Sequence, residues 1–402
     1  MEPSLRLLRL LPLTLLPLWG CATVENSSAE GSPLRVTQRW VQQVGEGSDR
    51  LHLQFTPIAV GRSIIAASHQ GRVIALEQER GQRLWQRDLH LPLNTGGVVA
   101  NTAEKSLLLF AGDEVVIALD AIDGEEVWRY EAGGEVITPA VVSGKRALIR
   151  SGDGRLIALD VATGKQLWVY RWSVSLLTLR GNSAPVVIDD KVLFGNGEGA
   201  LIALDLRRGE ELWQIKVAIP RGRSELERMV DIDANIVVSG DRIYLTAYGK
   251  GMSCYNIVNG RLLWKREVGG ESGAAIADSR LYLADRDGVL WSLSADDGSS
   301  FWRQPLLRRR HLTPPVVSGN YLIVGDEQGK LHWFLRQSGL PVAEVALKSF
   351  KEWFPRRVTD DRYHSLFPDS RAILAPPLVD ENRVYAMDQR GVLAAFSAVV
   401  AP

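Results

Sequence analysis

The residue types that carry most enzyme chemistry are present, but their spacing does not form a known catalytic pattern. No Gly-rich phosphate loop, His-Glu-x-x-His pattern, Cys-x-x-Cys pair or nucleophile elbow occurs. The histidines show no metal-ligand spacing. We therefore predict no catalytic residue, no metal site and no cofactor. The histidines are His52, His69, His90, His311, His332 and His364.

Three carboxylates stand at corresponding places in a repeated segment. Asp120, Asp160 and Asp205 each follow an Ala-Leu pair at the end of a short apolar stretch. An acid/base pair needs two particular carboxylates, whereas these recur with the repeat. Their recurrence predicts side-chain hydrogen bonds within turns.

Cys21 is the residue for which the sequence predicts covalent chemistry. Arg6 and Arg9 precede an apolar run at 10–18, which is typical of an export signal and too short for a comfortable membrane span. The run ends in Leu-Trp-Gly-Cys, which resembles a bacterial lipobox. We predict a signal peptide at 1–20 and a lipidated Cys21 that begins a flexible tether at 21–35. The alternative is an ordinary signal peptide with an incidental cysteine.

The rest of the chain consists largely of copies of one template. Residues 157–168 read Ile-Ala-Leu-Asp-Val-Ala-Thr-Gly-Lys-Gln-Leu-Trp. In each copy a small residue lies ten positions before a tryptophan, and a glycine lies four positions before it. Such a repeat is the first feature that a fold assignment has to explain. The template tryptophans are Trp85, Trp128, Trp168, Trp213, Trp264 and Trp302.

Each repeat contains four short strand-like segments. In the unit 138–170 these segments are separated by turns rich in glycine and aspartate, which is typical of antiparallel hairpins. No segment keeps an apolar period of 3.6, so a helical repeat is disfavoured. Four antiparallel strands at a period near 40 residues predict the blade of a β-propeller.

The repeats predict an all-β protein with eight blades over residues 36–402. The seventh repeat keeps the offsets but has Ala343 in the tryptophan position. The eighth begins at Pro376 and ends before its fourth strand. We expect the segment 36–44, which contains Trp40, to supply that strand and close the ring. Closure would remove the open sheet edges that promote aggregation.

The repeated tryptophans are expected to pack between neighbouring blades, because an aromatic residue found in every unit is more often core than ligand site. A row of ligand-stacking aromatics is the alternative. Cys254 occupies the small-residue position of its repeat, so we expect a buried apolar thiol.

Two long links interrupt the regular spacing on one face of the ring. From the template tryptophan to the next first strand there are 17 residues after Trp168 and 23 after Trp213, against 10 to 13 elsewhere. Leucines beside arginine and carboxylates have the composition of a docking surface. The alternative is that the leucines plug the mouth of the ring. The candidate partner-binding residues are Leu177, Leu179, Arg180, Asp231 and Asp233.

Two further segments on this face leave alternatives open. The long link at 347–372 mixes aromatic and charged residues, and either a capping helix or a disordered arm is compatible with it. The run Arg-Arg-Arg-His at 308–311 indicates a solvated loop or, alternatively, contact with an acidic partner. The chain as a whole carries 47 Lys+Arg and 47 Asp+Glu, so no overall field would attract nucleic acid.

The template Ala-Leu-Asp-x-x-x-Gly-x-x-x-Trp resembles the repeat of the pyrroloquinoline-quinone dehydrogenases, which are eight-bladed enzymes using the quinone and calcium. This chain is shorter, lacks their vicinal cysteines and shows no recognisable calcium segment. The lipobox, the eight repeats, the segment at 177–185 and the Asp-x-Asp at 231–233 resemble the BamB family more closely. Members of that family are lipoprotein subunits of the outer-membrane β-barrel assembly machinery.

This resemblance implies a non-enzymatic scaffold, anchored by lipid to the periplasmic face of the outer membrane. It implies that the protein docks on the periplasmic POTRA domains of BamA and assists the insertion of outer-membrane β-barrels. The unfolded chains of those β-barrels could be its clients. By motif match Leu177, Leu179, Arg180, Asp231 and Asp233 would contact BamA. The resemblance therefore favours docking over plugging. A quinone-dependent dehydrogenase is the alternative function.

Overall fold

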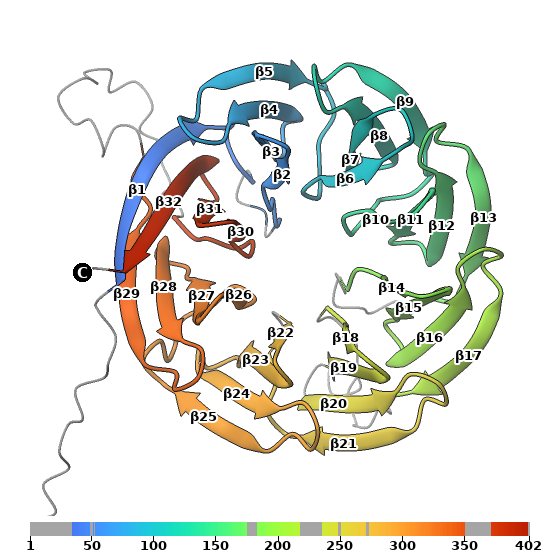
Figure 1. Ribbon diagram of the computed structural model, residues 1–402. Helices are drawn as coiled ribbons and strands as arrows, with labels where there is room; N and C mark the ends of the chain where they lie inside the picture. The colour runs from blue at the N-terminus through green and yellow to red at the C-terminus, as the bar shows by residue number, and fades with distance from the viewer. Residues whose placement is uncertain are drawn as a thin grey trace, which may run out of the picture.

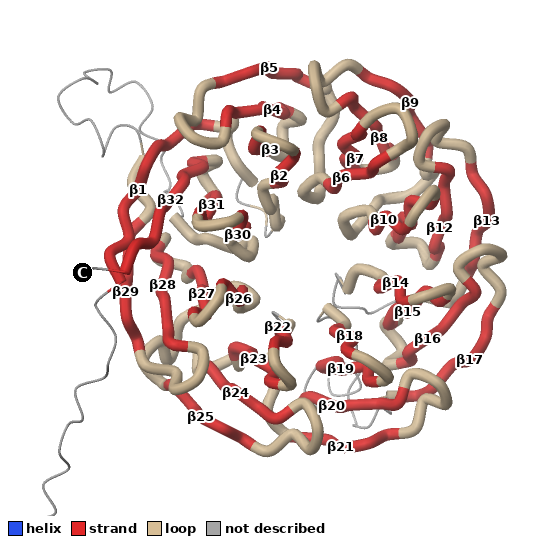
Figure 2. Tube along the Cα trace, in the orientation of Figure 1, coloured by secondary structure: helices blue, strands red, loops and turns tan. Residues whose placement is uncertain are grey.

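The computed structural model describes residues 34–48, 51, 53–174, 183–217, 235–247, 251–270, 273–349 and 371–400. In these residues all regular structure is β-strand (Figure 2). The strands form eight antiparallel sheets of four strands each. Among the described residues there is no helix of the length and apolarity needed to span a membrane.

The first four sheets, named blades one to four, follow one another along the chain. Blade one contains β2 (Ile58–Val60), β3 (Ser63–Ala67), β4 (Arg72–Glu77) and β5 (Arg83–Asp88). Blade two contains β6 (Val98–Asn101), β7 (Ser106–Gly112), β8 (Val115–Asp120) and β9 (Glu126–Glu131). Blade three contains β10 (Val141–Ser143), β11 (Arg146–Ser151), β12 (Arg155–Asp160) and β13 (Gln166–Arg171). Blade four contains β14 (Val186–Ile188), β15 (Lys191–Gly195), β16 (Ala200–Asp205) and β17 (Glu211–Lys216).

Blades five to eight complete the set. Blade five contains β18 (Val237–Ser239), β19 (Arg242–Ala247), β20 (Gly251–Asn256) and β21 (Leu262–Arg266). Blade six contains β22 (Ala274–Ala277), β23 (Arg280–Ala284), β24 (Leu290–Ser294) and β25 (Ser300–Gln304). Blade seven contains β26 (Val316–Ser318), β27 (Tyr321–Gly325), β28 (Lys330–Leu335) and β29 (Pro341–Ala346). Blade eight contains β30 (Leu378–Asp380), β31 (Arg383–Met387), β32 (Val392–Val400) and β1 (Leu34–Gln43).

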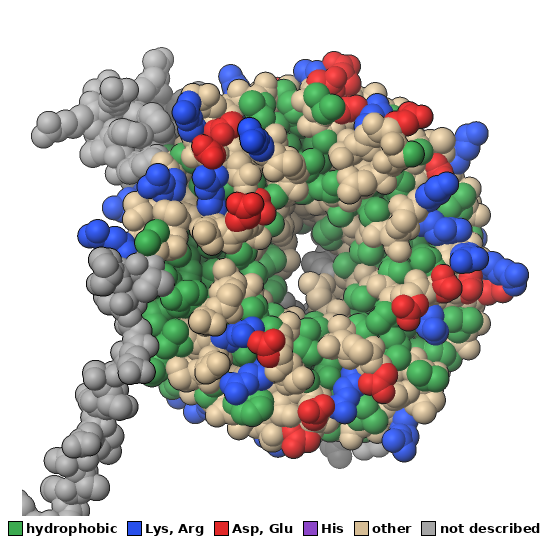
Figure 3. All heavy atoms as spheres, viewed as in Figure 1, with side chains coloured by type: hydrophobic (Ala, Val, Ile, Leu, Met, Phe, Trp, Pro, Cys, Tyr) green, Lys and Arg blue, Asp and Glu red, His purple; other side chains and the backbone are tan. Residues whose placement is uncertain are grey.

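The eight blades are arranged around a central axis, with their first strands nearest the axis and their fourth strands at the rim (Figure 1). The space-filling view shows an opening at the centre of the ring and side chains of both charges around it (Figure 3). The predicted all-β, eight-bladed propeller is confirmed.

Residues from the two ends of the chain meet in blade eight. β1 pairs antiparallel with β32, from Leu34 opposite Val400 to Gln43 opposite Val392. In Figure 1 the blue first strand lies beside the red last strand. The predicted closing strand is therefore confirmed, and hydrogen bonds rather than a covalent link hold the ring shut.

The inner strands of each blade are buried on both faces because neighbouring blades cover them. In β12, Leu156, Ile157, Ala158 and Leu159 are all fully buried. Strands covered on both faces have continuous apolar runs rather than alternation. The Cys254 thiol is likewise buried, as predicted, and burial raises its pKa to about 11.

The template tryptophans join each blade to the next one. The Trp128 indole N–H donates to the carbonyl of Val161 in the following blade, at 2.8 Å. Its ring packs on Gly164, where a Cβ atom would lie 2.6 Å from the tryptophan Cε3. Gly164 also has a φ of +69°, which favours glycine for a second reason. The predicted packing between blades is confirmed. The same hydrogen bond is made by Trp40, Trp85, Trp168, Trp264 and Trp302.

Two of the eight junctions differ from this arrangement. The buried indole nitrogen of Trp213 has no partner among the described residues. The hairpin glycine of blade five, Gly260, packs against Ile215 rather than against the Trp213 ring. At the other junction Ala343 occupies the tryptophan position. Blade eight has no hairpin between its third and fourth strands, because they come from opposite ends of the chain. There is thus no hairpin glycine on which a tryptophan at 343 could pack.

These differences predict unequal effects of removing the indole nitrogen. Trp128→Phe should lower the free energy of unfolding by about 1–3 kcal/mol, because the Val161 carbonyl loses its donor. Trp213→Phe should cost about 1 kcal/mol less than Trp128→Phe, because the Trp213 nitrogen makes no such bond to any residue that the structure describes. Urea unfolding followed by circular dichroism measures both. Equal losses in the two variants would contradict the proposed importance of the hydrogen bond.

Candidate functional site

The described ends of the long links lie on one face of the ring. Because the strands of a blade alternate in direction, the link to the next blade and the hairpin between the second and third strands share a face. We call this the loop face and the opposite one the hairpin face. Hydrogen bonds confirm the arrangement: Trp172 N–H donates to Gly154 O, and Val217 N–H donates to Gly199 O.

The predicted partner-binding residues lie outside the described residues. This applies to Leu177, Leu179, Arg180, Asp231 and Asp233, and also to Cys21. Their roles therefore stay predictions. What the structure describes is the framework from which the two links leave blades three and four and enter blades four and five.

An aromatic cluster supports the outgoing end of the first link, between β13 and β14. The Trp172 ring lies 5.0 Å from the Phe194 ring and 6.4 Å from the Tyr170 ring, measured between centroids. Phe194 is fully buried in blade four. Offset and tilted aromatic pairs stabilise beyond the area that they bury. The cluster therefore fixes the end of the link against both adjoining blades.

Arg150 connects the two ends of the same link. This side chain is 4% exposed, and its Nη1 donates to the carbonyl of Ser183 at 2.6 Å. Its guanidinium also lies 5.7 Å from the centroid of the Trp172 ring. A buried arginine that bonds a carbonyl and lies over an indole holds both in a defined geometry. Trp172 and Ser183, which flank the segment 175–182, are thereby fixed on the loop face.

The second link, between β17 and β18, has apolar ends. Val217 follows β17, and Ile236, which is 4% exposed, precedes β18. Both belong to one apolar cluster of blades four and five. The two links consequently emerge from neighbouring blades of the same face, as their lengths predicted.

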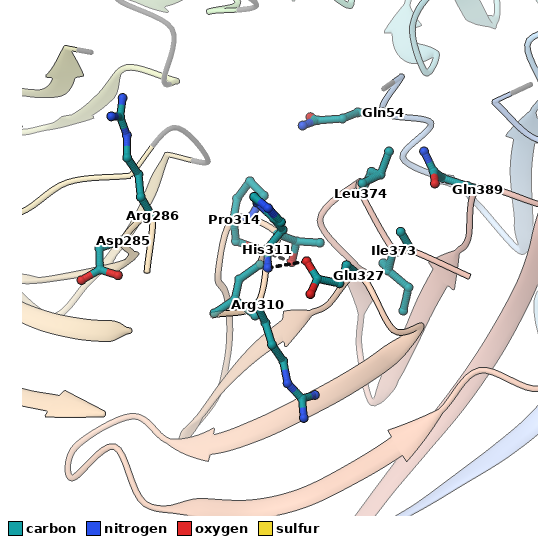
Figure 4. A pocket seen from close by; sticks show the side chains of 13 residues that line it. Gln54, Asp285, Arg286, Arg310, His311, Pro314, Glu327, Ile373, Leu374 and Gln389 are labelled. Atoms are coloured by element: carbon teal, nitrogen blue, oxygen red, sulfur yellow. Dashed lines mark hydrogen bonds between the residues drawn. The ribbon is translucent and has the colours of Figure 1, made fainter. Parts of the chain in front are cut away.

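A second candidate site lies elsewhere on the loop face, among blades six, seven and eight. It is a cavity of about 540 Å³. Gln54, Leu374 and Gln389 lie on one side, Arg286 lies on the other, and His311 and Glu327 lie between them (Figure 4). The remaining lining residues are Asp285, Arg310, Leu312, Thr313, Pro314, Ala372 and Ile373.

A buried ionic network lies beneath this cavity. Asp326 is fully buried and accepts from Arg310 and from His332 Nε2, the latter at 2.9 Å. Burial alone would raise the pKa of Asp326, but hydrogen bonds from His332, the Lys330 backbone and Arg310 outweigh it and hold that pKa below 3.8. Glu344 interacts with the other His332 nitrogen at 3.4 Å. The network connects the cavity wall to the rim of blade seven.

The repeated carboxylates make turn hydrogen bonds. Asp120 accepts from the backbone N–H of Ile122, Asp160 from that of Thr163, and Asp205 from that of Arg207. The interpretation as turn residues is confirmed. In the described parts of the chain no group of three or more His, Cys, Asp or Glu residues is placed to hold a metal ion.

Comparison with known proteins identifies the family. Residues 69–304 and 292–400 match the family described as outer membrane protein assembly factor BamB. The chain is 33% identical over 387 residues to the protein of that name from Pseudomonas aeruginosa, covering 94% of this chain and 95% of the relative. The chain belongs to the BamB family. The family resemblance found in the sequence is confirmed.

Solved structures show how widely the fold is shared. BamB from Moraxella catarrhalis superposes with a TM-score of 0.74 at 24% identity, over 90% of this chain and all of that one. Quinohemoprotein alcohol dehydrogenase from Comamonas testosteroni superposes with a TM-score of 0.68 at 12% identity, over 90% of this chain and 76% of that one. At these identities both comparisons support the fold alone.

The cavity among blades six to eight was not predicted from the sequence. Its walls come from links and hairpins of three blades and from Gln54, at positions 54–389 of the chain. The basic run at 308–311 was the available signal, and two of its residues, Arg310 and His311, line the cavity. The sequence pattern does not show that Arg310 and His311 line the same cavity as the apolar residues at 372–374.

The ionic network predicts a stability loss that depends on pH. The folded-state pKa of Asp326 is lowered, so its contribution is fully present above its unfolded pKa of about 3.9 and is lost as the pH falls through the lowered folded-state pKa. Asp326→Asn should therefore cost about 3–5 kcal/mol at pH 7 and less at a pH of about 2.5. Urea unfolding at both pH values measures this. Asp287→Asn, an exposed change on the same face, is the control. A loss independent of pH would contradict the assignment.

Proposed function

We propose that this chain is a non-enzymatic scaffold subunit of the machinery that assembles outer-membrane β-barrels. The observation that carries the proposal is family membership: relatives that match more than nine-tenths of the chain are named outer membrane protein assembly factor BamB. A ring with fixed loop ends suits a scaffold, because rigid elements position binding loops without a large ordering cost.

The proposed partner is BamA, bound through its periplasmic POTRA domains. Leu177, Leu179 and Arg180 on the first link, with Asp231 and Asp233 on the second, would make the contact. The fixed ends of these links, at Arg150–Ser183 and Val217–Ile236, support the proposal. Leucine anchors beside one arginine and two carboxylates would combine apolar burial with charge-directed orientation.

The docking proposal predicts loss of BamA from the purified complex. Arg180→Ala combined with Asp231→Ala should reduce BamA co-purified from detergent-solubilised outer membranes by about tenfold or more. The matched control is Arg207→Ala with Asp241→Ala, which removes the same charge types from exposed positions on the hairpin face. Equal BamA recovery from the docking variant and from the control would rule out these residues as the docking site.

We further propose that Cys21 is lipidated and holds the protein at the periplasmic face of the outer membrane. Several acyl chains give stable anchoring, whereas one chain gives only reversible binding. Cys21→Ala should therefore move the protein from the outer-membrane fraction to other fractions. Fractionation, with mass spectrometry of the mature N-terminus, measures this. An unmodified wild-type Cys21 would contradict the anchor, whatever the fractionation shows.

The alternative function, a quinone-dependent dehydrogenase, is supported by the resemblance of the repeat and by fold likeness to the alcohol dehydrogenases. Its test is separate from the docking test. The purified protein is reconstituted with pyrroloquinoline quinone and calcium, and dye reduction is followed on alcohols and sugars. Robust turnover would overturn the non-enzymatic part of the proposal, while background rates would support it.

A further inference from the structure

The closing strand is longer than the strands that occupy the same position in the other blades. Strand β1 has 10 residues and its partner β32 has 9, whereas every other fourth strand has five or six. In blade eight the strand pairing continues for four additional residue pairs, from Thr37 opposite Ser397 to Leu34 opposite Val400. These two strands therefore form a ribbon that extends past the place where the other blades turn back in a hairpin.

The ribbon packs on the rim of blade seven, at the junction that has an alanine in the tryptophan position. Leu34 is only 7% exposed, although it is the first residue of the chain that the structure describes. It belongs with Val36 to an apolar cluster that includes Val345 of β29. Strands β1 and β29 are in contact, and their ends meet at the left of Figure 1. The ribbon therefore covers apolar surface that a tryptophan and a hairpin glycine cover at the regular junctions.

A side chain of the closing strand also bonds the backbone of blade seven. The Gln38 amide nitrogen donates to the carbonyl of Lys348 at 2.9 Å, and its amide oxygen accepts from the N–H of Lys348 at 3.0 Å. A side-chain amide can make both bonds because it carries a donor and an acceptor. At the corresponding position of blade three, Gln166 accepts from the Tyr130 hydroxyl of the preceding blade. Gln38 thus bonds two backbone groups of its preceding blade, whereas Gln166 bonds one side chain.

These contacts lie where the chain enters the ring. The residues before Leu34 are the predicted tether, so a pull on that segment would reach the ring at Leu34 and peel β1 from β32. No hairpin joins β1 to β32, because the two strands come from opposite ends of the chain. Terminal strands open readily unless they are tied down. The ribbon and the Gln38 contact are therefore the first interactions that such a pull would have to break.

We propose that residues 34–38 and 397–400 form a clasp that keeps the ring closed when the N-terminal segment is under load. The additional strand pairs, the packing on blade seven and the bonds between Gln38 and Lys348 together slow the detachment of β1. The source of the load rests on the lipid anchor at Cys21 proposed above, whereas the clasp does not need that anchor. Failure of the lipidation test would remove the source of load, and failure of the experiments below would remove the clasp.

The first test pulls on the purified full chain with optical tweezers. The handles are attached at Ser28→Cys, before the ring, and at Glu104→Cys, on an exposed turn of blade two. All proteins also carry Cys21→Ser, so the result does not depend on lipidation. At constant force, Gln38→Met should shorten the lifetime of the closed ring about tenfold or more, because two hydrogen bonds to backbone groups are lost. The matched change in blade three, Gln166→Met, should leave that lifetime unchanged.

The second test measures opening without force. Leu34→Ser with Val36→Ser removes apolar side chains of the clasp and should speed amide hydrogen exchange in β1 about tenfold or more, without changing exchange in blades three and four. Leu84→Ser, at an exposed position on the fourth strand of blade one, is the control and should leave exchange in β1 unchanged. Thermal melts confirm folding of each variant. Lifetimes and exchange rates that are equal in each clasp variant and its control would overturn the proposal.

Discussion

The contact between a tryptophan of one blade and a hairpin of the next is the interaction on which the ring depends. A blade is a small sheet that cannot cover its own two faces, so it is stable only between two neighbours. The indole provides a large apolar surface, and its N–H bonds a carbonyl that would otherwise be buried without a donor, as Trp128 does with Val161. The hairpin glycine is required because a Cβ there would overlap the ring.

The ring is closed by strand pairing as well as by a tryptophan contact. Strand β1 completes blade eight from the other end of the chain, and the tryptophan that it carries, Trp40, bonds the Gln78 carbonyl of blade one. The same strand fixes where the chain enters the ring. Fourth strands run from the hairpin face to the loop face, so Leu34 lies on the hairpin face. The predicted tether thus joins the ring on the face opposite the long links.

In this fold the residues that stabilise the ring differ from the residues proposed to bind partners. The tryptophans, glycines and turn carboxylates are used in holding blades together, and the fold they specify is shared by assembly factors and alcohol dehydrogenases. Here the loop face carries the described ends of the two long links, fixed by Arg150 and Ile236, and the cavity among blades six to eight.

The sequence by itself determined the blade number, the closing strand and the role of the repeated tryptophans. It could do so because these features recur at fixed offsets and each repeat forms the same local hairpins. The structure alone revealed the Trp213 nitrogen that has no partner among the described residues, the Arg150–Ser183 bond, the network around Asp326 and the cavity. These depend on side chains from different blades meeting in three dimensions. Gln54 and Gln389, for example, line the same cavity although they are far apart in the sequence, and no local pattern predicts that shared position.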